Sequence, residues 1–252
     1  MEATEKALVL RVGRFREADA WVRLLTPSHG VFTAFAFGGL RSRRRFLGCL
    51  DPLNLVLFSI TSDKRGAYQR LTEGTLLNGF QALKRNKALV GQAVNCIKFI
   101  EAIEPGADDG RIAFGLLVDL LETLADQQPE GDLFPLLFRA RLIFTMGFTP
   151  DFLSCSRCGA VLNGVGKVLF SVESGQVTCS ACKSDNKAVD GLARPVTVGA
   201  LRALDWIMRS SPAQWSGVGM SADVRSQIFE LIEFFVAYHL GLQWEGRNYK
   251  KV

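Results

Sequence analysis

The chain has 252 residues, of which 48% are hydrophobic and 22% are charged, and its formal net charge is +5. This composition predicts a large core divided over two or three units and excludes an intrinsically disordered tail. The longest apolar runs, such as residues 53–60 and 134–138, are far shorter than the roughly 20 residues of a membrane-spanning helix, which excludes an integral membrane protein.

The positive charge is concentrated in the first third of the chain. Residues 1–85 contain 14 Lys and Arg against 7 Asp and Glu, a balance of +7, whereas residues 86–252 contain 16 against 18, a balance of −2. Such asymmetry is typical of a surface for nucleic acid or an anionic membrane, although a lone basic run is usually a solvated face. The start of the chain, with Glu2 and Glu5, lacks the pattern of a secretory signal, so we expect a cytoplasmic protein.

The first 80 residues alternate in hydrophobicity with the period of strands. Turn-forming residues bound the runs, for example Thr-Pro-Ser-His-Gly at residues 26–30. The expected strands are residues 7–12, 21–26, 30–37, 53–60 and 68–77. Five antiparallel strands in about 80 residues favour a small closed barrel of the OB type, because closure removes the exposed edges of an open sheet.

The connection between the third and fourth expected strands is strongly basic. Residues 38–46 read Gly-Gly-Leu-Arg-Ser-Arg-Arg-Arg-Phe, and the arginines are Arg41, Arg43, Arg44 and Arg45. Guanidinium groups donate paired hydrogen bonds to phosphates, and like charges this close repel one another unless an anion is present. We therefore expect this connection to bind DNA phosphates; the alternatives are a localisation signal, a heparin-like patch or a solvated loop.

Further basic residues on neighbouring turns would extend the same groove: Arg14, Arg16, Lys64 and Arg65. Phe46, at the end of the basic connection, either stacks on a base or anchors the core, and the second role is the commoner one for an aromatic residue at a strand entry.

From about residue 83 the hydrophobic period becomes helical. The expected helices are residues 89–103, 112–124, 132–146, 198–208 and 221–242. Pro105 and Gly106 separate the first two, and Ser221 is a good N-cap for the last, with Asp223 in its first turn. The helix at 132–146 is apolar on most sides, which predicts burial between neighbours.

Two Cys-x-x-Cys motifs, Cys155 with Cys158 and Cys179 with Cys182, are separated by 20 residues. Zinc takes four thiolates at tetrahedral corners, and two intervening residues allow a tight turn to direct both thiolates at one ion. Short strands at 168–170 and 176–178 would form a ribbon between the motifs. The alternatives are a disulfide pair or a redox dithiol.

A filled shell of four thiolates leaves no open position for catalysis, so we expect one structural zinc ion. Cys49 and Cys96 lie on apolar segments and are expected to be small buried residues.

We expect no catalytic site. Residues 217–222 match a dinucleotide-binding pattern, but the polar stretch around Pro212 cannot supply the strand that must precede it. His29, in a turn, and His239, a partly buried helix residue, are too far apart in sequence to suggest a pair. A metal-dependent nuclease would need clustered carboxylates and an open metal position, and neither can be argued from the sequence.

Several motifs occur together in a fixed order. They are residues 7–11, 16–19, 24–30, 38–46, 50–53 and 144–150, followed by Cys155, Cys158, Gly175, Cys179 and Cys182. On these motifs, which span nearly the whole chain, the sequence resembles the RecO recombination mediators of bacterial DNA repair. One departure is the single Gly175, where many relatives have a glycine pair before the third cysteine.

The resemblance implies an α+β multi-domain fold, with an OB domain at residues 1–80 and a helical domain at 81–252 that carries an inserted zinc ribbon at about 151–190. RecO-like proteins bind single- and double-stranded DNA and anneal complementary strands. With a RecR partner they load recombinase onto strands coated by single-stranded-DNA-binding protein, whose acidic tail binds the helical domain. Such a protein would be cytoplasmic and nucleoid-associated and would break no bonds.

Carried over to this sequence, the resemblance assigns DNA contact to the basic connection and zinc binding to the four cysteines. The alternative from another functional class is a zinc-stabilised adaptor whose basic patch meets an acidic protein.

Overall fold

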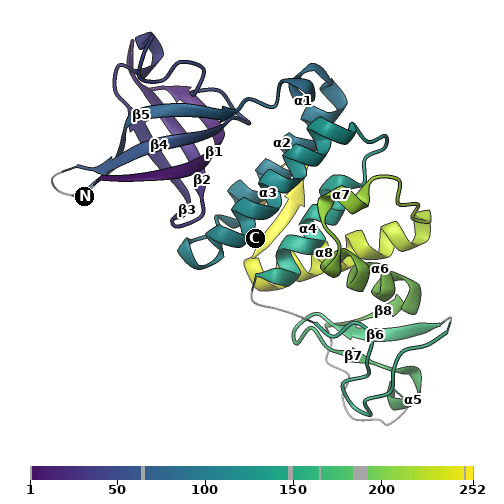
Figure 1. Cartoon of the computed structure of the whole chain (residues 1–252). Coiled ribbons are helices and arrows are strands. Elements are labelled where there is room, and N and C mark those ends of the chain that lie inside the picture. The colour runs from purple at the N-terminus through teal and green to yellow at the C-terminus, as the bar shows by residue number, and fades with distance from the viewer. Residues whose placement is uncertain are drawn as a thin grey trace. The chain divides into compact units, whose positions relative to one another are not determined.

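The computed structural model describes residues 2–63, 66–146, 150–164, 166–183, 192–246 and 248–251 (Figure 1). The chain divides into two compact units, Met1–Gln128 and Pro129–Val252. No helix within the described ranges combines the length and the apolar character needed to cross a bilayer.

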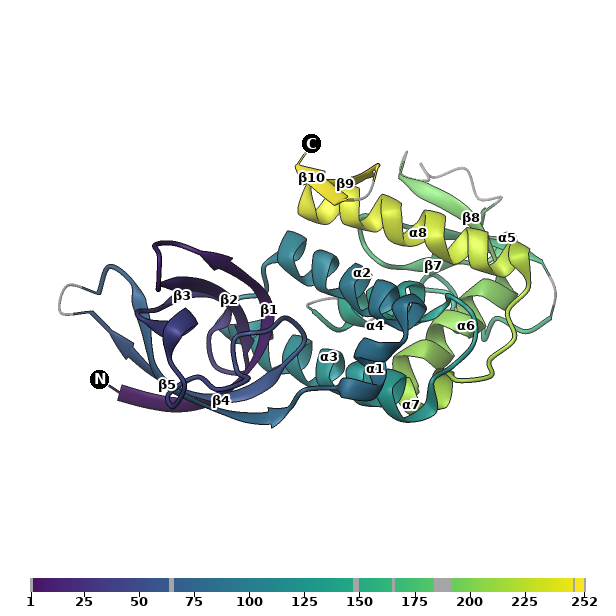
Figure 2. The ribbon, with the colours of Figure 1, turned by 90° about the horizontal axis from the view of Figure 1, so that it is seen from above.

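A closed five-stranded barrel forms the first part of the N-terminal unit (Figures 1 and 2). Its strands are β1 (Glu2–Arg14), β2 (Ala20–Thr26), β3 (Gly30–Ala36), β4 (Leu55–Ser62) and β5 (Gln69–Asn78). Around the ring the order is β1-β2-β3-β5-β4, and β4 pairs back to β1. This order confirms the expected OB-type barrel.

The expectation that all five strands run antiparallel is wrong at one position. β3 and β5 pair in parallel through Ala34 with Gln69 and Phe35 with Arg70, whereas the other pairs are antiparallel. A closed ring with an odd number of strands cannot alternate direction all the way round, so at least one neighbouring pair must be parallel. Barrel closure therefore requires the parallel pair.

The barrel interior is filled mainly by small and branched side chains on alternate strand positions. The buried core comprises Ala7, Val9, Ala20, Val22, Leu24, Ala34, Ala36, Phe46, Cys49, Val56, Phe58, Ile60 and Leu71. Phe46 is only 3% exposed and packs against Phe58, with ring centroids 6.4 Å apart. Phe46 thus anchors the core and is not available to a base, and Cys49 is buried as expected.

Three helices complete the N-terminal unit: α1 (Gln81–Arg85), α2 (Lys87–Ile103) and α3 (Ala107–Gln127). They pack against one another, and α3 packs against β2 and β3. The corner between α2 and α3 is fixed to the β2–β3 turn, because the Val31 N–H donates to the carbonyl oxygen of Pro105 at 2.9 Å. Gly30 in that turn has φ of +67°, and a Cβ there would lie 1.9 Å from the same oxygen.

The C-terminal unit combines helices with two small sheets. Its helices are α4 (Phe134–Thr145), α5 (Ser180–Lys183), α6 (Val198–Arg209), α7 (Pro212–Trp215) and α8 (Ala222–Leu240). One sheet has the order β7-β6-β8, from β6 (Lys167–Ser171), β7 (Val177–Thr178) and β8 (Ala193–Thr197). The other is a hairpin of β9 (Leu242–Glu245) and β10 (Asn248–Lys251).

Aromatic rings join the helices to the three-stranded sheet. Phe144 on α4 contacts Phe235 on α8 and Phe152 at centroid distances of 5.0 and 5.2 Å. Phe152 in turn stacks on Phe170 of β6 at 6.1 Å. The His239 Nε2–H of α8 donates to the carbonyl oxygen of Val172 at 2.8 Å. The sheet is therefore fixed to the helices by a continuous buried core.

The C-terminal hairpin is held by a buried cation. The Arg139 guanidinium on α4 lies 4.8 Å from the ring centroid of Trp244 and 5.3 Å from that of Tyr249, one ring from each strand. Glu233 on α8 pairs with Arg139 at 3.4 Å and accepts a hydrogen bond from the Tyr249 hydroxyl at 2.7 Å. Burial raises the pKa of that hydroxyl above its ordinary range, so it stays a donor.

All five expected helices and both expected ribbon strands are present. The Ser221 hydroxyl caps α8 by accepting from the Val224 N–H at 3.3 Å, as expected. However, α8 ends at Leu240 and not at residue 242, because Gly241 adopts φ of +58° and terminates the helix. The sequence interpretation also missed β8, which contains Pro195, and the hairpin. β8 is an edge strand, where a proline is tolerated.

Replacing Gly30 by alanine should destabilise the N-terminal unit. The positive φ costs about 1–2 kcal/mol in any other residue, and the clash with the Pro105 carbonyl adds to it. Gly66→Ala is the matched control, since Gly66 has φ of +68° with nothing within 4 Å of an added Cβ. Urea unfolding followed by circular dichroism should give a clearly lower midpoint for Gly30→Ala, and equal shifts in both variants would contradict this packing.

Candidate nucleic-acid interface and metal site

The basic connection between β3 and β4 is fixed against the barrel at several points. It begins with a short 3-10 helix, Gly39–Arg41. The Gly38 N–H donates to the Asp19 carboxylate at 2.7 Å, and the Leu40 N–H donates to the Ala18 carbonyl at 3.0 Å, so the connection lies on the β1–β2 turn. Further along, the Gly74 N–H of β5 donates to the Arg45 carbonyl at 2.8 Å.

The four arginines of this connection are all exposed, but they differ in their partners. Arg41 forms an ion pair with Glu17 of the β1–β2 turn. Arg45 donates to the Phe37 carbonyl at 2.9 Å, and its guanidinium lies 5.2 Å from the Phe46 ring centroid. Within the described part of the chain, Arg43 and Arg44 make no such ion pair or hydrogen bond. These two side chains are therefore the most available to an anion.

The structure describes two of the four other basic residues that we expect to contact DNA. Arg14, at the end of β1, and Arg16, in the β1–β2 turn, are both exposed. The Arg16 guanidinium lies 5.2 Å from the ring centroid of Phe15. Lys64 and Arg65 lie outside the described residues. The structure thus brings the β1–β2 turn, with Arg16, next to the start of the basic connection.

An aromatic cluster lies on the outside of the barrel, beside the basic connection. Its members are Phe15, Phe35, Phe37 and Tyr68. Phe35 is 5.4 Å from Phe15, 6.2 Å from Phe37 and 5.7 Å from Tyr68, measured between ring centroids. The sequence interpretation missed this cluster and considered Phe46 instead. A signal was present, because Phe35 and Phe37 alternate with two buried alanines along one strand.

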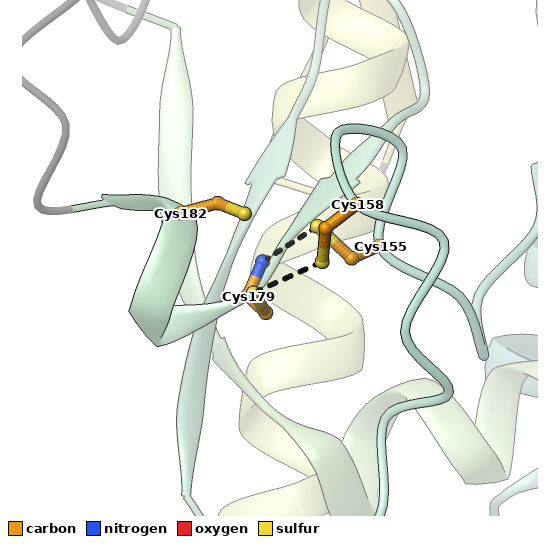
Figure 3. Close-up of side chains that lie close together, drawn as sticks. All are labelled: Cys155, Cys158, Cys179 and Cys182. Carbon is orange, nitrogen blue, oxygen red and sulfur yellow. Dashed lines mark hydrogen bonds between the residues drawn. The ribbon is translucent and has the colours of Figure 1, made fainter.

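The four motif cysteines gather in the C-terminal unit (Figure 3). The sulfur atoms of Cys155, Cys158, Cys179 and Cys182 all lie within 4.8 Å of one another. The Cys158 and Cys179 sulfurs are 3.8 Å apart, and the Cys179 N–H donates to the Cys155 sulfur at 3.3 Å. No second group of His, Cys, Asp and Glu ligands this close occurs within the described ranges.

Two short turns place these thiols. The first is closed by hydrogen bonds from the Cys155 N–H to the Ala160 carbonyl and from the Gly159 N–H to the Cys155 carbonyl, each at 2.9 Å. The second leads from β7 through Cys179 into α5, which carries Cys182. The Ser156 N–H donates to the Val177 carbonyl at 2.8 Å, so the two turns are joined directly by a backbone hydrogen bond.

The cluster fits a tetrahedral thiophilic cation. Sulfurs bound at ~2.3 Å to a tetrahedral zinc ion lie about 3.8 Å apart, which is the Cys158–Cys179 separation. All six cysteines are free thiols, so the alternative of a disulfide pair finds no support in the geometry. The four residues can therefore hold a metal ion.

Two of the four thiols, those of Cys155 and Cys182, have pKa values shifted in opposite directions. Burial raises the pKa of the Cys155 thiol, but N–H groups of Cys179, Cys158 and Arg157 outweigh it and lower this pKa to about 6. Hydrogen bonds with the Cys158 and Cys179 sulfurs raise the pKa of Cys182 to about 12. Thiols this close cannot all ionise at neutral pH without a cation, because each negative charge raises the pKa of the next.

Two family models match consecutive parts of the chain. The model "Recombination protein O N terminal" matches residues 1–80, and the model "Recombination protein O C terminal" matches residues 90–247. The chain belongs to the RecO family.

Curated RecO relatives agree with this assignment over all or nearly all of their length. The DNA repair protein RecO of Maridesulfovibrio salexigens is 41% identical over 252 residues, and that of Oleidesulfovibrio alaskensis is 43% identical over 252 residues, each covering 100% of both chains. The DNA repair protein RecO of Myxococcus xanthus is 30% identical over 238 residues, covering 94% of this chain and 92% of its own. This RecO-family chain is thus a DNA repair protein of a family named for recombination.

Proposed function

We propose that this chain is a recombination mediator that binds single- and double-stranded DNA through its barrel and anneals complementary strands. With a RecR-like partner it helps to load recombinase onto strands coated by single-stranded-DNA-binding protein. The observation that carries the proposal is the fixed basic connection of the barrel, whose exposed Arg43 and Arg44 form no ion pair with any carboxylate of the described residues. Family membership supports the same function.

Annealing on this surface follows from charge and needs no bond-breaking chemistry. Two DNA strands repel each other through their phosphates, and guanidinium groups that bind phosphates on both strands lower that repulsion. The basic connection is suited to this role because its backbone is anchored to the β1–β2 turn and to β5 while its side chains reach into solvent. We place the protein in the cytoplasm, at the nucleoid, where these substrates occur.

We further propose that the thiol cluster holds one structural zinc ion. Cys155, Cys158, Cys179 and Cys182 supply four soft ligands, which fill a tetrahedral shell and leave no position for substrate. The ion would join the two turns of a ribbon whose β7 strand has only two residues, Val177–Thr178. Such a small sheet has little core of its own, so metal ligation would contribute directly to its folding.

The rival function is an adaptor whose basic patch binds an acidic protein. It predicts little affinity for short oligonucleotides at moderate salt, whereas a mediator binds and anneals them. Annealing of complementary oligonucleotides, followed by fluorescence with and without single-stranded-DNA-binding protein, separates the two. The mediator hypothesis fails if the protein neither binds nor anneals oligonucleotides at low salt.

Neutralising the basic connection should weaken DNA binding and its salt dependence. With Arg41, Arg43, Arg44 and Arg45 all changed to glutamine, the slope of log affinity against log salt for single strands should fall by at most about 3, at roughly 0.7 per lost phosphate contact. The Arg43→Gln/Arg44→Gln pair should account for more of this loss than the Arg41→Gln/Arg45→Gln pair, because among the residues that the structure describes only Arg41 and Arg45 have such partners.

The control for this series is Arg202→Gln/Arg209→Gln, two exposed arginines on α6 of the other unit. This pair removes the same charge as each double variant, so an equal loss of slope would assign DNA binding to net charge and not to the connection. Fluorescence anisotropy titrations at several salt concentrations measure both the affinity for DNA and its salt slope.

Removing one thiol ligand should weaken metal binding. Cys158→Ser, at an exposed ligand position, is expected to reduce bound zinc well below one ion per chain and to lower the melting temperature of the C-terminal unit. Cys96→Ala, which removes a thiol outside the cluster, should retain full zinc. Elemental analysis and thiol titration after purification without chelator measure the bound zinc and the reactive thiols. Substoichiometric zinc together with four reactive thiols in the unaltered protein would refute the site.

A further inference from the structure

The aromatic cluster on the barrel is partly exposed and contributes nothing to the barrel interior. Phe15 is 48% exposed and Tyr68 is 40% exposed, and neither belongs to the buried core. Large aromatic side chains usually bury most of their surface, and contiguous exposed apolar groups commonly mark a binding site. The cluster therefore needs a reason other than folding.

Three segments far apart in sequence assemble the cluster. Phe15 lies in the β1–β2 turn, which is closed by a hydrogen bond from its N–H to the Asp19 carbonyl at 2.9 Å. Phe35 is fixed by the parallel pairing of β3 with β5, and Phe37 follows at the end of the same strand. Tyr68 precedes β5, and its N–H donates to the Asp63 carboxylate at 3.1 Å. The rings are thus carried by an ordered framework before any ligand binds.

The surroundings of the cluster are cationic. The Arg16 guanidinium lies 5.2 Å from the Phe15 ring centroid, and the Arg70 guanidinium lies 5.4 Å from that of Phe37. Of the nearby carboxylates, Glu17 is neutralised by Arg41, while Asp19 and Asp63 accept hydrogen bonds from the Gly38 and Tyr68 N–H groups. A ligand with flat apolar faces and negative charges alongside would complement this surface, whereas a neutral apolar peptide would leave the cations unused.

We propose that Phe15, Phe37 and Tyr68 form a stacking platform for unpaired bases, which gives the barrel a preference for single-stranded over double-stranded DNA. This inference rests on the proposed DNA-binding function and assigns it a substrate preference. Aromatic rings can stack on every base, so the platform is tolerant of sequence, while the flanking arginines follow the backbone phosphates. A duplex hides the faces of its bases and would meet only the arginines.

The test removes the aromatic rings but keeps apolar side chains and the net charge. The variant Phe15→Leu/Tyr68→Leu keeps apolar side chains at both exposed positions, and its matched control, Phe15→Tyr/Tyr68→Phe, keeps both rings. Each is titrated with a short oligothymidylate, with an abasic oligonucleotide of equal length and with a duplex of equal length. Melting temperatures of both variants show whether the fold is retained.

We expect the leucine variant to lose roughly fivefold or more in affinity for the oligothymidylate for each base that loses its stack. Its affinity for the duplex and for the abasic strand should stay unchanged, as should the salt slope, because no phosphate contact is lost. The ring-preserving variant should bind the oligothymidylate like the unaltered protein. A base analogue whose fluorescence is quenched by stacking should report the same difference.

The outcomes separate this inference from the proposed function. Unchanged affinity for the oligothymidylate in the leucine variant overturns the platform, while the arginine variants still test DNA binding itself. An equal loss on single strand, abasic strand and duplex also overturns it, because the rings would then only position the basic connection. If the unaltered protein binds none of the three, the proposed function fails, and the aromatic surface would have to serve a protein partner.

Discussion

The pairing of β3 with β5 closes the barrel, and the surface that we propose for DNA depends on it. Because five strands cannot alternate all the way round a ring and the other four pairs are antiparallel, this pair runs in parallel, with Phe35 opposite Arg70. That register sets the start of β5, with Tyr68, beside the end of β3 and the basic connection that follows it. A single topological requirement thereby gathers aromatic and cationic side chains that the sequence keeps apart.

On the DNA surface that we propose, the two kinds of side chain would perform complementary tasks. Guanidinium groups neutralise phosphates, which carry no sequence information, and aromatic rings accept the face of any base. Sequence-independent binding is what an annealing protein requires, since it must act on every pair of complementary strands. Backbone groups of Gly38, Leu40 and Arg45 anchor the connection to the barrel. Arg41 pairs with Glu17 there, while Arg43 and Arg44 stay exposed.

In the C-terminal unit, both the thiol cluster and the buried aromatic core adjoin the small three-stranded sheet. The sheet is too small to bury a core of its own, so Phe152 and Phe170 pack onto helix residues Phe144 and Phe235. The four thiols converge on the two turns beside β7. The metal ion that we propose there would join these turns and so add to the stability of the sheet.

The sequence by itself determined the barrel strands, the main helices and the cysteine set, because alternation, helical period and motif spacing are local properties. It determined the exposed arginine run for the same reason. Only the tertiary structure decided the parallel pair, the burial of Phe46 and the joining of Phe15, Phe37 and Tyr68 into one surface. These depend on barrel closure and on contacts between distant segments. The tertiary structure also decided which arginines of the connection have a protein partner. Glu17 and the Phe37 carbonyl reach Arg41 and Arg45 only after folding.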